Sequence, residues 1–117
     1  MKKFHIAIST DRIAATINDY TVCLGQGPCS YIENEYALWL TESLNVSIRQ
    51  DASCSPGGLR HLGWEDEDAS EFSAQTDVNG ITWERFSAKL QADEINELWP
   101  QANYEPRTGF ASLNLNH

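Results

Sequence analysis

The stretch DVNGITWERF, residues 77–86, carries the most specific local pattern in the chain. Its first four residues end in Asn79-Gly80, a pair typical of a turn because both residues tolerate the backbone conformations that turns require. Residues 81–86 then predict a β-strand, since β-branched and aromatic side chains favour strands. One carboxylate, that of Glu84, lies inside this strand in an apolar setting. The stretch therefore predicts a turn and a strand that presents a single acid.

The first half of the chain predicts a βαβββ unit. Residues 4–9 place alternate apolar side chains on one face, as a strand does. A helix is expected next, with Thr10 or Asp11 as its N-cap and Gly25 where a C′ glycine belongs. Three further strands are expected at residues 31–33, 36–40 and 44–50.

The second half predicts a shortened copy of the same unit. Residues 51–58, rich in Ser, Pro and Gly, are a linker. Residues 60–64 then repeat the form of residues 4–8, in which a histidine is followed by an apolar, a small and an apolar residue. Too few residues separate Asp68 from Asp77 for a long helix and two strands. A late amphipathic helix is expected at residues 89–99, stopped by Pro100, and a short strand at residues 110–113.

The fold class expected from these elements is α+β. Two βαβββ-type modules, the second abbreviated, would form a curved mixed sheet around a central cleft. The 117 residues suffice for one domain. Its first module would span about residues 1–52, and the shortened second module about residues 57–117. We expect the late helix to fill the space that the missing helix of the second module leaves.

Charge and composition restrict the partners. The formal net charge of −9 argues against nucleic acid and anionic membranes, whose phosphates such a surface repels on average. The apolar run after the first residues is too short for a signal peptide, so a cytoplasmic protein is expected. Cys23, Cys29 and Cys54 are odd in number and lack metal-ribbon spacing, so neither a disulfide framework nor a zinc ribbon is expected.

Three residues could carry chemistry together: His5, His61 and Glu84. Two imidazoles and one carboxylate form the facial triad that non-haem Fe(II) commonly takes, with three positions left open for substrate, water or dioxygen. All three residues lie on predicted strands, which place ligands rigidly. If the two modules pack about a pseudo-twofold axis, His5 and His61 occupy equivalent positions on paired strands, and Glu84 approaches from the last strand.

These residues resemble a known family. The strand FHIAIS at residues 4–9, GLRHLG at residues 58–63 and DVNGITWERF at residues 77–86 are similar to motifs of the vicinal oxygen chelate superfamily. That superfamily includes glyoxalases, extradiol dioxygenases and bleomycin-resistance proteins. The nearest branch is the cadmium-induced or carbon–arsenic lyase-like one, and the resemblance spans roughly residues 3–87.

The resemblance implies that His5, His61 and Glu84 bind a divalent metal ion, with Fe(II) favoured and Mn, Ni or Zn as alternatives. A fourth, glyoxalase-type glutamate is missing, because Val46, Ser47 and Ile48 stand at its place. This favours a dioxygenase-like set of three ligands. The adjacent cysteines of carbon–arsenic lyases would lie in the shortened segment, so that activity is disfavoured. A small-molecule substrate and a homodimer are implied as partners.

Other interpretations of the same residues stay open. The chain could be a metal-free protein of bleomycin-resistance type that binds or sequesters a small planar ligand, or a degenerate module that only contacts other proteins. Single histidines and glutamates are most often structural or exposed, and nothing is assigned to His117. Trp39, Trp64, Trp83 and Trp99 are expected in the core.

Residues 65–68, an acidic run, are expected to be a solvated turn, since they lack the spaced ligands and glycine of a calcium loop. Arg49 and Arg60 are candidates to hold an anionic group, because an arginine fork suits a carboxylate. The strand phase predicts that Arg60 faces away from the cavity that His61 faces.

Overall fold

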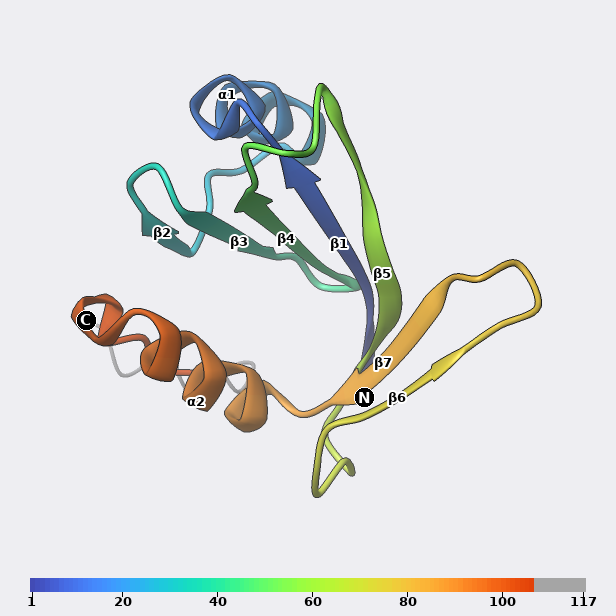
Figure 1. The fold of residues 1–117 in the computed structure, drawn as a ribbon. Helices are drawn as coiled ribbons and strands as arrows, with labels where there is room; N and C mark the ends of the chain where they lie inside the picture. The colour runs from blue at the N-terminus through green and yellow to red at the C-terminus, as the bar shows by residue number, and fades with distance from the viewer. Residues whose placement is uncertain (107–117) are drawn as a thin grey trace.

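A seven-stranded mixed β-sheet organises the protein, and two helices pack on it (Figure 1). The structure is a computed structural model, which describes residues 1–106. In chain order the elements are β1 (Lys2–Thr10), α1 (Ile13–Leu24), β2 (Ser30–Ile32), β3 (Tyr36–Leu40), β4 (Leu44–Gln50), β5 (Gly57–Asp66), β6 (Ser73–Thr76), β7 (Thr82–Phe86) and α2 (Ala88–Leu98), followed by a 3₁₀ turn at Pro100–Ala102. The α+β class expected from the sequence is confirmed. The strand expected at residues 110–113 lies outside the described residues.

The strand order in the sheet is β2-β3-β4-β1-β5-β7-β6. On one side of the central pair, β1 runs parallel to β4, and β4 runs antiparallel to β3. On the other side, β5 runs parallel to β7, and β7 runs antiparallel to β6. β1 and β5 themselves pair antiparallel. The two sides of the sheet therefore share one pattern of pairing, and β1 and β5 meet at the boundary between them.

The junction between β1 and α1 differs from its sequence prediction. The helix begins after Arg12, which has no side-chain cap, so neither Thr10 nor Asp11 is the N-cap. Instead, the Gln50 side chain at the end of β4 accepts the N–H of Ile13 at 3.0 Å. A distant amide thus satisfies a helix donor that a local side chain was expected to satisfy. At the other end Gly25 adopts the left-handed conformation, as predicted.

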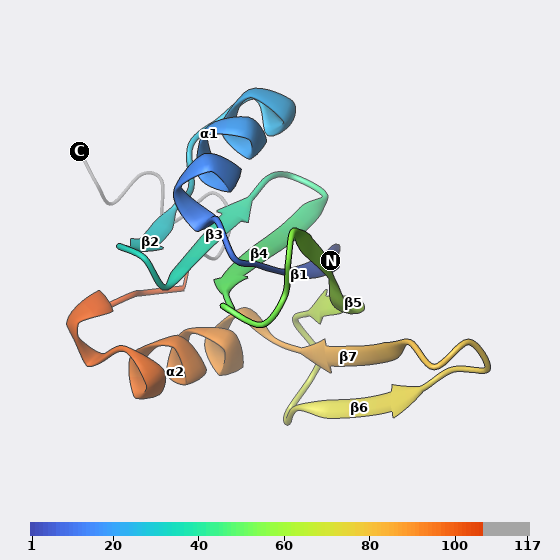
Figure 2. The ribbon, with the colours of Figure 1, turned by 45° about the horizontal axis from the view of Figure 1, so that its top comes forward.

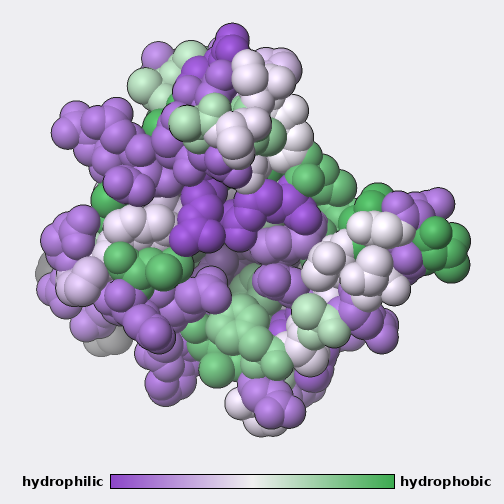
Figure 3. Space-filling model, in the orientation of Figure 1, coloured by the Kyte–Doolittle hydropathy of each residue, from purple (hydrophilic) through white to green (hydrophobic). Residues whose placement is uncertain are grey.

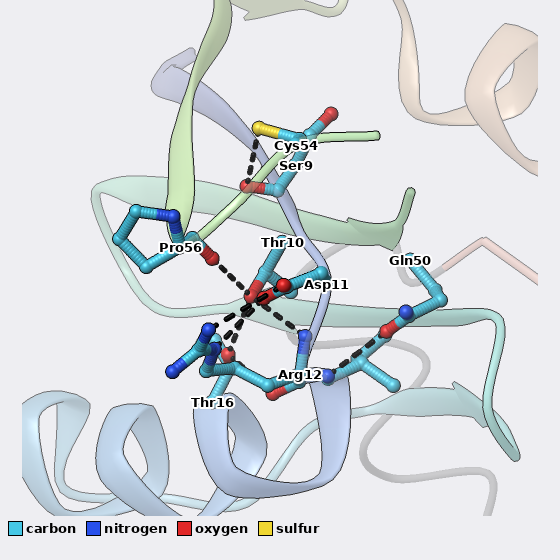
Figure 4. A network of polar contacts seen from close by, with 9 residues as sticks. Ser9, Thr10, Asp11, Arg12, Thr16, Gln50, Cys54 and Pro56 are labelled. Carbon is cyan, nitrogen blue, oxygen red and sulfur yellow. Dashed lines mark hydrogen bonds and ion pairs between the residues drawn. The ribbon is translucent and has the colours of Figure 1, made fainter. Parts of the chain in front are cut away.

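Polar contacts fasten this junction to the linker that precedes β5 (Figure 4). The Thr10 hydroxyl accepts the backbone N–H of Arg12 at 3.1 Å and donates to the Pro56 carbonyl at 3.2 Å. The Cys54 thiol donates to the Ser9 carbonyl at 3.7 Å. The end of β1 therefore fixes where β5 starts, which in turn fixes the pairing of the two central strands.

α1 covers one face of the first side of the sheet, which we call the α1 face. Its apolar stripe packs there, with Ile13, Ile17, Tyr20 and Leu24 against the strands. Beneath it Trp39 and Ile48 are fully buried. Removing such large apolar side chains from water is the main stabilising term in a domain of this size.

α2 lies on the opposite face, which we call the cleft face (Figures 1 and 2). Ile95 of α2 packs against Ile32, Tyr36 and Leu38 of β2 and β3. The expectation that this helix fills the space of a missing second-module helix is therefore wrong. The apolar residues that receive Ile95 lie on the first side of the sheet, so the helix crosses back to them.

The α1 face has no helix over β5 and β7 in the part of the chain that the structure describes. Leu59 is 47% exposed and Trp64 is 39% exposed there. Phe4 contacts both Trp64 and Trp83, with ring centroids 5.2 and 6.2 Å apart. The expected core position is confirmed for Trp39. Trp64 lies outside the core, because no helix of the described residues covers it.

Candidate metal centre

The turn before β7 is held by a single carboxylate, that of Asp77. Its Oδ1 accepts two backbone N–H groups of the turn, one of them from Ile81 at 3.0 Å, and its Oδ2 accepts the indole N–H of Trp83 at 2.9 Å. Gly80 adopts a φ of 80°, which a residue with a side chain rarely adopts. Trp83 is thereby tied to the α1 face. Glu84, the next residue on the strand, points to the cleft face.

The sheet register brings the three sequence-predicted ligands together. His5 of β1, Gly63 of β5 and Glu84 of β7 lie opposite one another across three adjacent strands. His61 lies two residues before Gly63, so its side chain is on the same face. Gly63 also permits close packing of β5 and β7, since a Cβ atom there would lie 2.2 Å from the Glu84 carbonyl oxygen. His5, His61 and Glu84 therefore converge on the cleft face.

The distances between these side chains suit one metal ion. The Nε2 atoms of His5 and His61 lie 3.0 Å apart, and His61 Nε2 lies 3.1 Å from Glu84 Oε1. One ligand atom from each residue lies within 4.8 Å of the others. Two ligands at right angles, each about 2.1 Å from an ion, are about 3.0 Å apart. This group can therefore hold a metal ion, and its donor set suits a divalent cation.

His5 is held as a neutral ligand. Its Nδ1 lies 3.1 Å from the Asn45 backbone oxygen and 2.9 Å from the Asn45 Oδ1, which both accept, so Nδ1 carries the proton. The lone pair of Nε2 then faces His61. Burial lowers the pKa of His5 to about 4, so the imidazole stays uncharged at neutral pH. The tautomer and the charge are both those that a metal ligand requires.

Glu84 supplies the negative charge of the site. The hydrogen bond from His61 holds the pKa of this carboxyl below its ordinary value, although burial acts in the opposite direction. His61 Nε2–H has two acceptors nearby, His5 Nε2 and Glu84 Oε1. A cation bound here would take the place of that one proton.

A second layer of polar residues positions His5, and sequence reasoning missed it. Asn45 Nδ2 donates to Gln91 Oε1 and to Glu65 Oε1, both at 2.8 Å, and Gln91 Nε2 donates back to Asn45 Oδ1 at 3.2 Å. Asn45 and Gln91 are buried. Such partners orient metal-binding histidines in many sites. The available signal was a polar residue, Asn45, in the same phase as a candidate ligand on an adjacent strand.

The ligands lie at a cleft of about 350 Å³ between the sheet and α2, a volume that suits a small molecule. Figure 3 shows the hollow on this side of the molecule, bordered by strongly hydrophilic surface with hydrophobic surface beside it. The aromatic side chains that line the cleft are Tyr36, Phe72, Phe86 and Trp99. Trp99, which was expected in the core, is partly buried against the apolar cluster of Ile32, Tyr36, Leu38 and Ile95 and also lines this cleft.

Arg60 also lines the cleft, so the prediction that it faces away from the cavity is wrong. The register between β1 and β5 shifts at this point: Ala7 is opposite His61, but Ile8 is opposite Leu59. Arg60 is therefore the extra residue of a β-bulge. A bulge breaks the strict alternation of side chains, which lets Arg60 and His61 face the same cleft. Arg49, on β4, lines it as well.

Comparisons with known proteins give the fold alone. No family model and no curated protein matches the chain. A hypothetical protein from Staphylococcus aureus has a similar structure, with a TM-score of 0.56 and 7% identity over 74% of this chain and 33% of that chain. The match thus spans about a third of that protein. A chain described as NAD-dependent benzaldehyde dehydrogenase from Legionella pneumophila has a TM-score of 0.52 and 8% identity over 72% of this chain and 97% of that chain.

Neither α1 nor α2 is long and apolar enough to cross a membrane, and this holds for all helices of residues 1–106.

Proposed function

We propose that His5, His61 and Glu84 bind one divalent metal ion and that the protein is a metal-dependent enzyme of the glyoxalase or extradiol dioxygenase type. Its substrate would be a small molecule that binds through two neighbouring oxygen atoms. The observation that carries the proposal is the convergence of three ligand atoms, with octahedral-edge spacings of 3.0 and 3.1 Å, in a cleft. A bound ion would act as a Lewis acid or as a site for dioxygen.

The pattern of strand pairing supports membership of the vicinal oxygen chelate superfamily. β5, β7 and β6 pair with one another as β1, β4 and β3 do. This agrees with two modules, of which the second lacks its helix and one strand. Under this interpretation His5 and His61 occupy corresponding first strands, and Glu84 lies on the strand that corresponds to β4.

The number of ligands favours the dioxygenase-like set. Ser47 on β4 lines the cleft where a four-ligand site would need a carboxylate. Two histidines and one carboxylate leave several positions of an octahedral ion open. We therefore favour Fe(II), with Mn, Ni or Zn as the other candidates.

Metal analysis tests the proposal directly. The protein is loaded anaerobically with Fe(II), and separately with Mn(II), desalted and analysed for bound metal. We expect about one ion per chain in the wild type and loss of at least tenfold in affinity for His61→Ala and Glu84→Gln. Glu33→Gln, an exposed acid in the β2–β3 turn, is the matched control and should bind metal normally. Absence of bound metal in the wild type under all loadings would exclude the proposal.

A second candidate function is metal-free binding of a planar ligand, as in bleomycin-resistance proteins. The observation in its favour is the aromatic lining of the cleft, where Tyr36 and Trp99 stack with centroids 4.8 Å apart. Quenching of tryptophan fluorescence by planar cationic ligands, measured in EDTA, distinguishes the two. Binding that does not respond to metal loading or to His61→Ala would favour this second candidate.

We also propose a homodimer that covers the α1 face of β5 and β7. Trp64 and Leu59 are exposed on this face, and a patch of this kind favours association. Sedimentation should show a dimer whose dissociation constant rises at least tenfold in Trp64→Ser. Val78→Ser, at an exposed position of the β6–β7 turn, should leave the dimer unchanged. A wild-type monomer at high concentration would contradict this proposal.

A further inference from the structure

Two arginines of the cleft form no ion pair with any acid of residues 1–106, although acids are abundant in this chain. Asp and Glu together number 17, against 8 Lys and Arg. Within residues 1–106, Arg12 pairs with Asp11 and Arg85 pairs with Asp66, whereas Arg49 and Arg60 make no ion pair. Both of these arginines line the cleft that holds the candidate metal ligands.

The two guanidinium groups reach the cleft from opposite sides of the central strand β1. Arg49 lies on β4, where it pairs with Ser9 of β1. Arg60 lies on β5, on the other side of β1, and is the bulged residue beside His61. The bulge is the device that turns Arg60 toward this cleft. Burial and the positive charge of Arg49 lower the pKa of Arg60, while the negative charges of Glu84 and Glu94 act in the opposite direction.

Arg49 is held in place by an aromatic ring. Its guanidinium carbon lies 5.3 Å from the centre of the Trp99 ring, and Trp99 stacks in turn on Tyr36. Stacking fixes the plane of a guanidinium but leaves its N–H groups at the edge available for an acceptor. This arrangement suits recognition of a planar anion such as a carboxylate.

We propose that Arg49 and Arg60 form an anion subsite, so that the substrate is a small carboxylate-bearing molecule whose two neighbouring oxygens face His5, His61 and Glu84. The chelating half of this inference rests on the proposed metal-dependent function; the anion subsite stands on the arginines themselves. A carboxylate would give both guanidinium groups the acceptor that residues 1–106 do not supply. It would also reduce the repulsion between them.

Acidic side chains near the proposed subsite should weaken its binding of an anion. Glu94 and Glu97 of α2 line the same cleft, with the carboxyl group of Glu94 partly buried at its rim. Burial and the charge of Glu84 raise the pKa of Glu94, while Arg49 and Arg60 act in the opposite direction. Glu94→Gln should strengthen the binding of an anion a few-fold, because it removes a like charge from the rim of the cleft.

The test uses two probes that differ by one carboxylate, catechol and 3,4-dihydroxybenzoate. Titration calorimetry measures both with Mn(II)-loaded protein and with protein in EDTA. We expect the wild type to bind 3,4-dihydroxybenzoate at least tenfold more tightly than catechol in the loaded form. Arg49→Gln and Arg60→Gln should each reduce that ratio about tenfold, without changing the affinity for catechol. Arg12→Gln, which lies outside the cleft, should leave the ratio unchanged.

The two forms of the protein separate the two proposals. A carboxylate preference that persists in EDTA and disappears in the arginine variants supports the anion subsite, even if the chain binds no metal and the proposed function fails. Metal binding with no preference for the carboxylate overturns the subsite and leaves the proposed function standing. A preference that survives in both arginine variants also overturns it.

Discussion

Two tryptophans stand at opposite ends of one row across the sheet, and their surroundings differ. The row consists of Trp39, Val46, Ile6, Leu62 and Trp83, all on the α1 face. Trp39 lies under α1 and is fully buried, whereas Trp83 is only partly buried, with no described helix above it. Each indole N–H has an acceptor, Gln26 for Trp39 and Asp77 for Trp83.

The two sides of the sheet differ in what they supply: one supplies most of the buried apolar packing, and the other supplies most of the candidate ligands. The side of the sheet under α1 holds the main apolar cluster and supplies one candidate ligand, His5. The other side, formed by β5, β7 and β6, supplies two candidate ligands, His61 and Glu84. The site lies at the boundary between the sides, so it depends on the pairing of β1 with β5 and of β5 with β7. Changes on the two sides should therefore have different effects.

Trp39→Ala should have the largest effect on stability. Loss of a fully buried indole costs about 3–5 kcal/mol of unfolding free energy, because the cavity beneath α1 cannot collapse completely. Trp83→Ala should cost about 1–2 kcal/mol, because its ring is already partly in water. Urea unfolding followed by circular dichroism measures both. Equal losses would show that the uncovered side is as well packed as the covered one.

Gly63→Ala should disturb the boundary itself. The added Cβ would lie 2.2 Å from the Glu84 carbonyl oxygen, so β5 and β7 must separate. We expect a loss of about 1–3 kcal/mol together with weaker metal binding, since Glu84 moves with β7. Gly58→Ala is the control on the same strand: its Cβ would meet only Cys54 Sγ at 3.9 Å, and stability should change by about 0.5 kcal/mol or less. A neutral Gly63→Ala would show that the two strands can shift freely.

The boundary should also be sensitive to pH. The pKa of His5 is about 4 in the folded protein, below its ordinary value of 6.5. The unfolded chain therefore takes up a proton first, and stability present above pH 6.5 is lost as pH falls toward 4. Between pH 7 and pH 5 this group should remove about 2 kcal/mol from the unfolding free energy. Urea midpoints measured in EDTA at the two pH values, for the wild type and for His5→Gln, report it. A pH dependence that is the same in His5→Gln would assign the effect to other groups.

Periodicity predicted most of the elements, because strands and helices impose their own spacing on apolar residues. The three candidate ligands came instead from their residue types on predicted strands and from the resemblance to motifs of the vicinal oxygen chelate superfamily. Periodicity failed where long-range geometry decides. One extra residue in β5 reversed the expected direction of Arg60, and no local pattern marks such a bulge. The apolar residues of α2 predicted a helix but not which side of the sheet would receive Ile95.

The polar layer behind His5 was missed for a related reason. Asn45 and Gln91 are separated by 46 residues, and each is unremarkable within its own segment. Only the folded arrangement shows that they satisfy each other and fix the imidazole. The resemblance to the vicinal oxygen chelate superfamily, in turn, rests on short motifs, and the metal and probe measurements are the tests that decide it.

The antiparallel pairing of β1 with β5 also has a consequence for folding. It joins His5 to a histidine 56 residues further along the chain, so the ligands come together only after slow, non-local strand pairing. An unfolded chain holds these three groups far apart and would bind the proposed cation poorly. The cation would then act as a thermodynamic clamp on the native sheet, worth about 2.7 kcal/mol at a free concentration of about 100 times its dissociation constant. The lifetime of the folded protein would then depend on the supply of metal, and a chelator would shorten that lifetime by removing the cation.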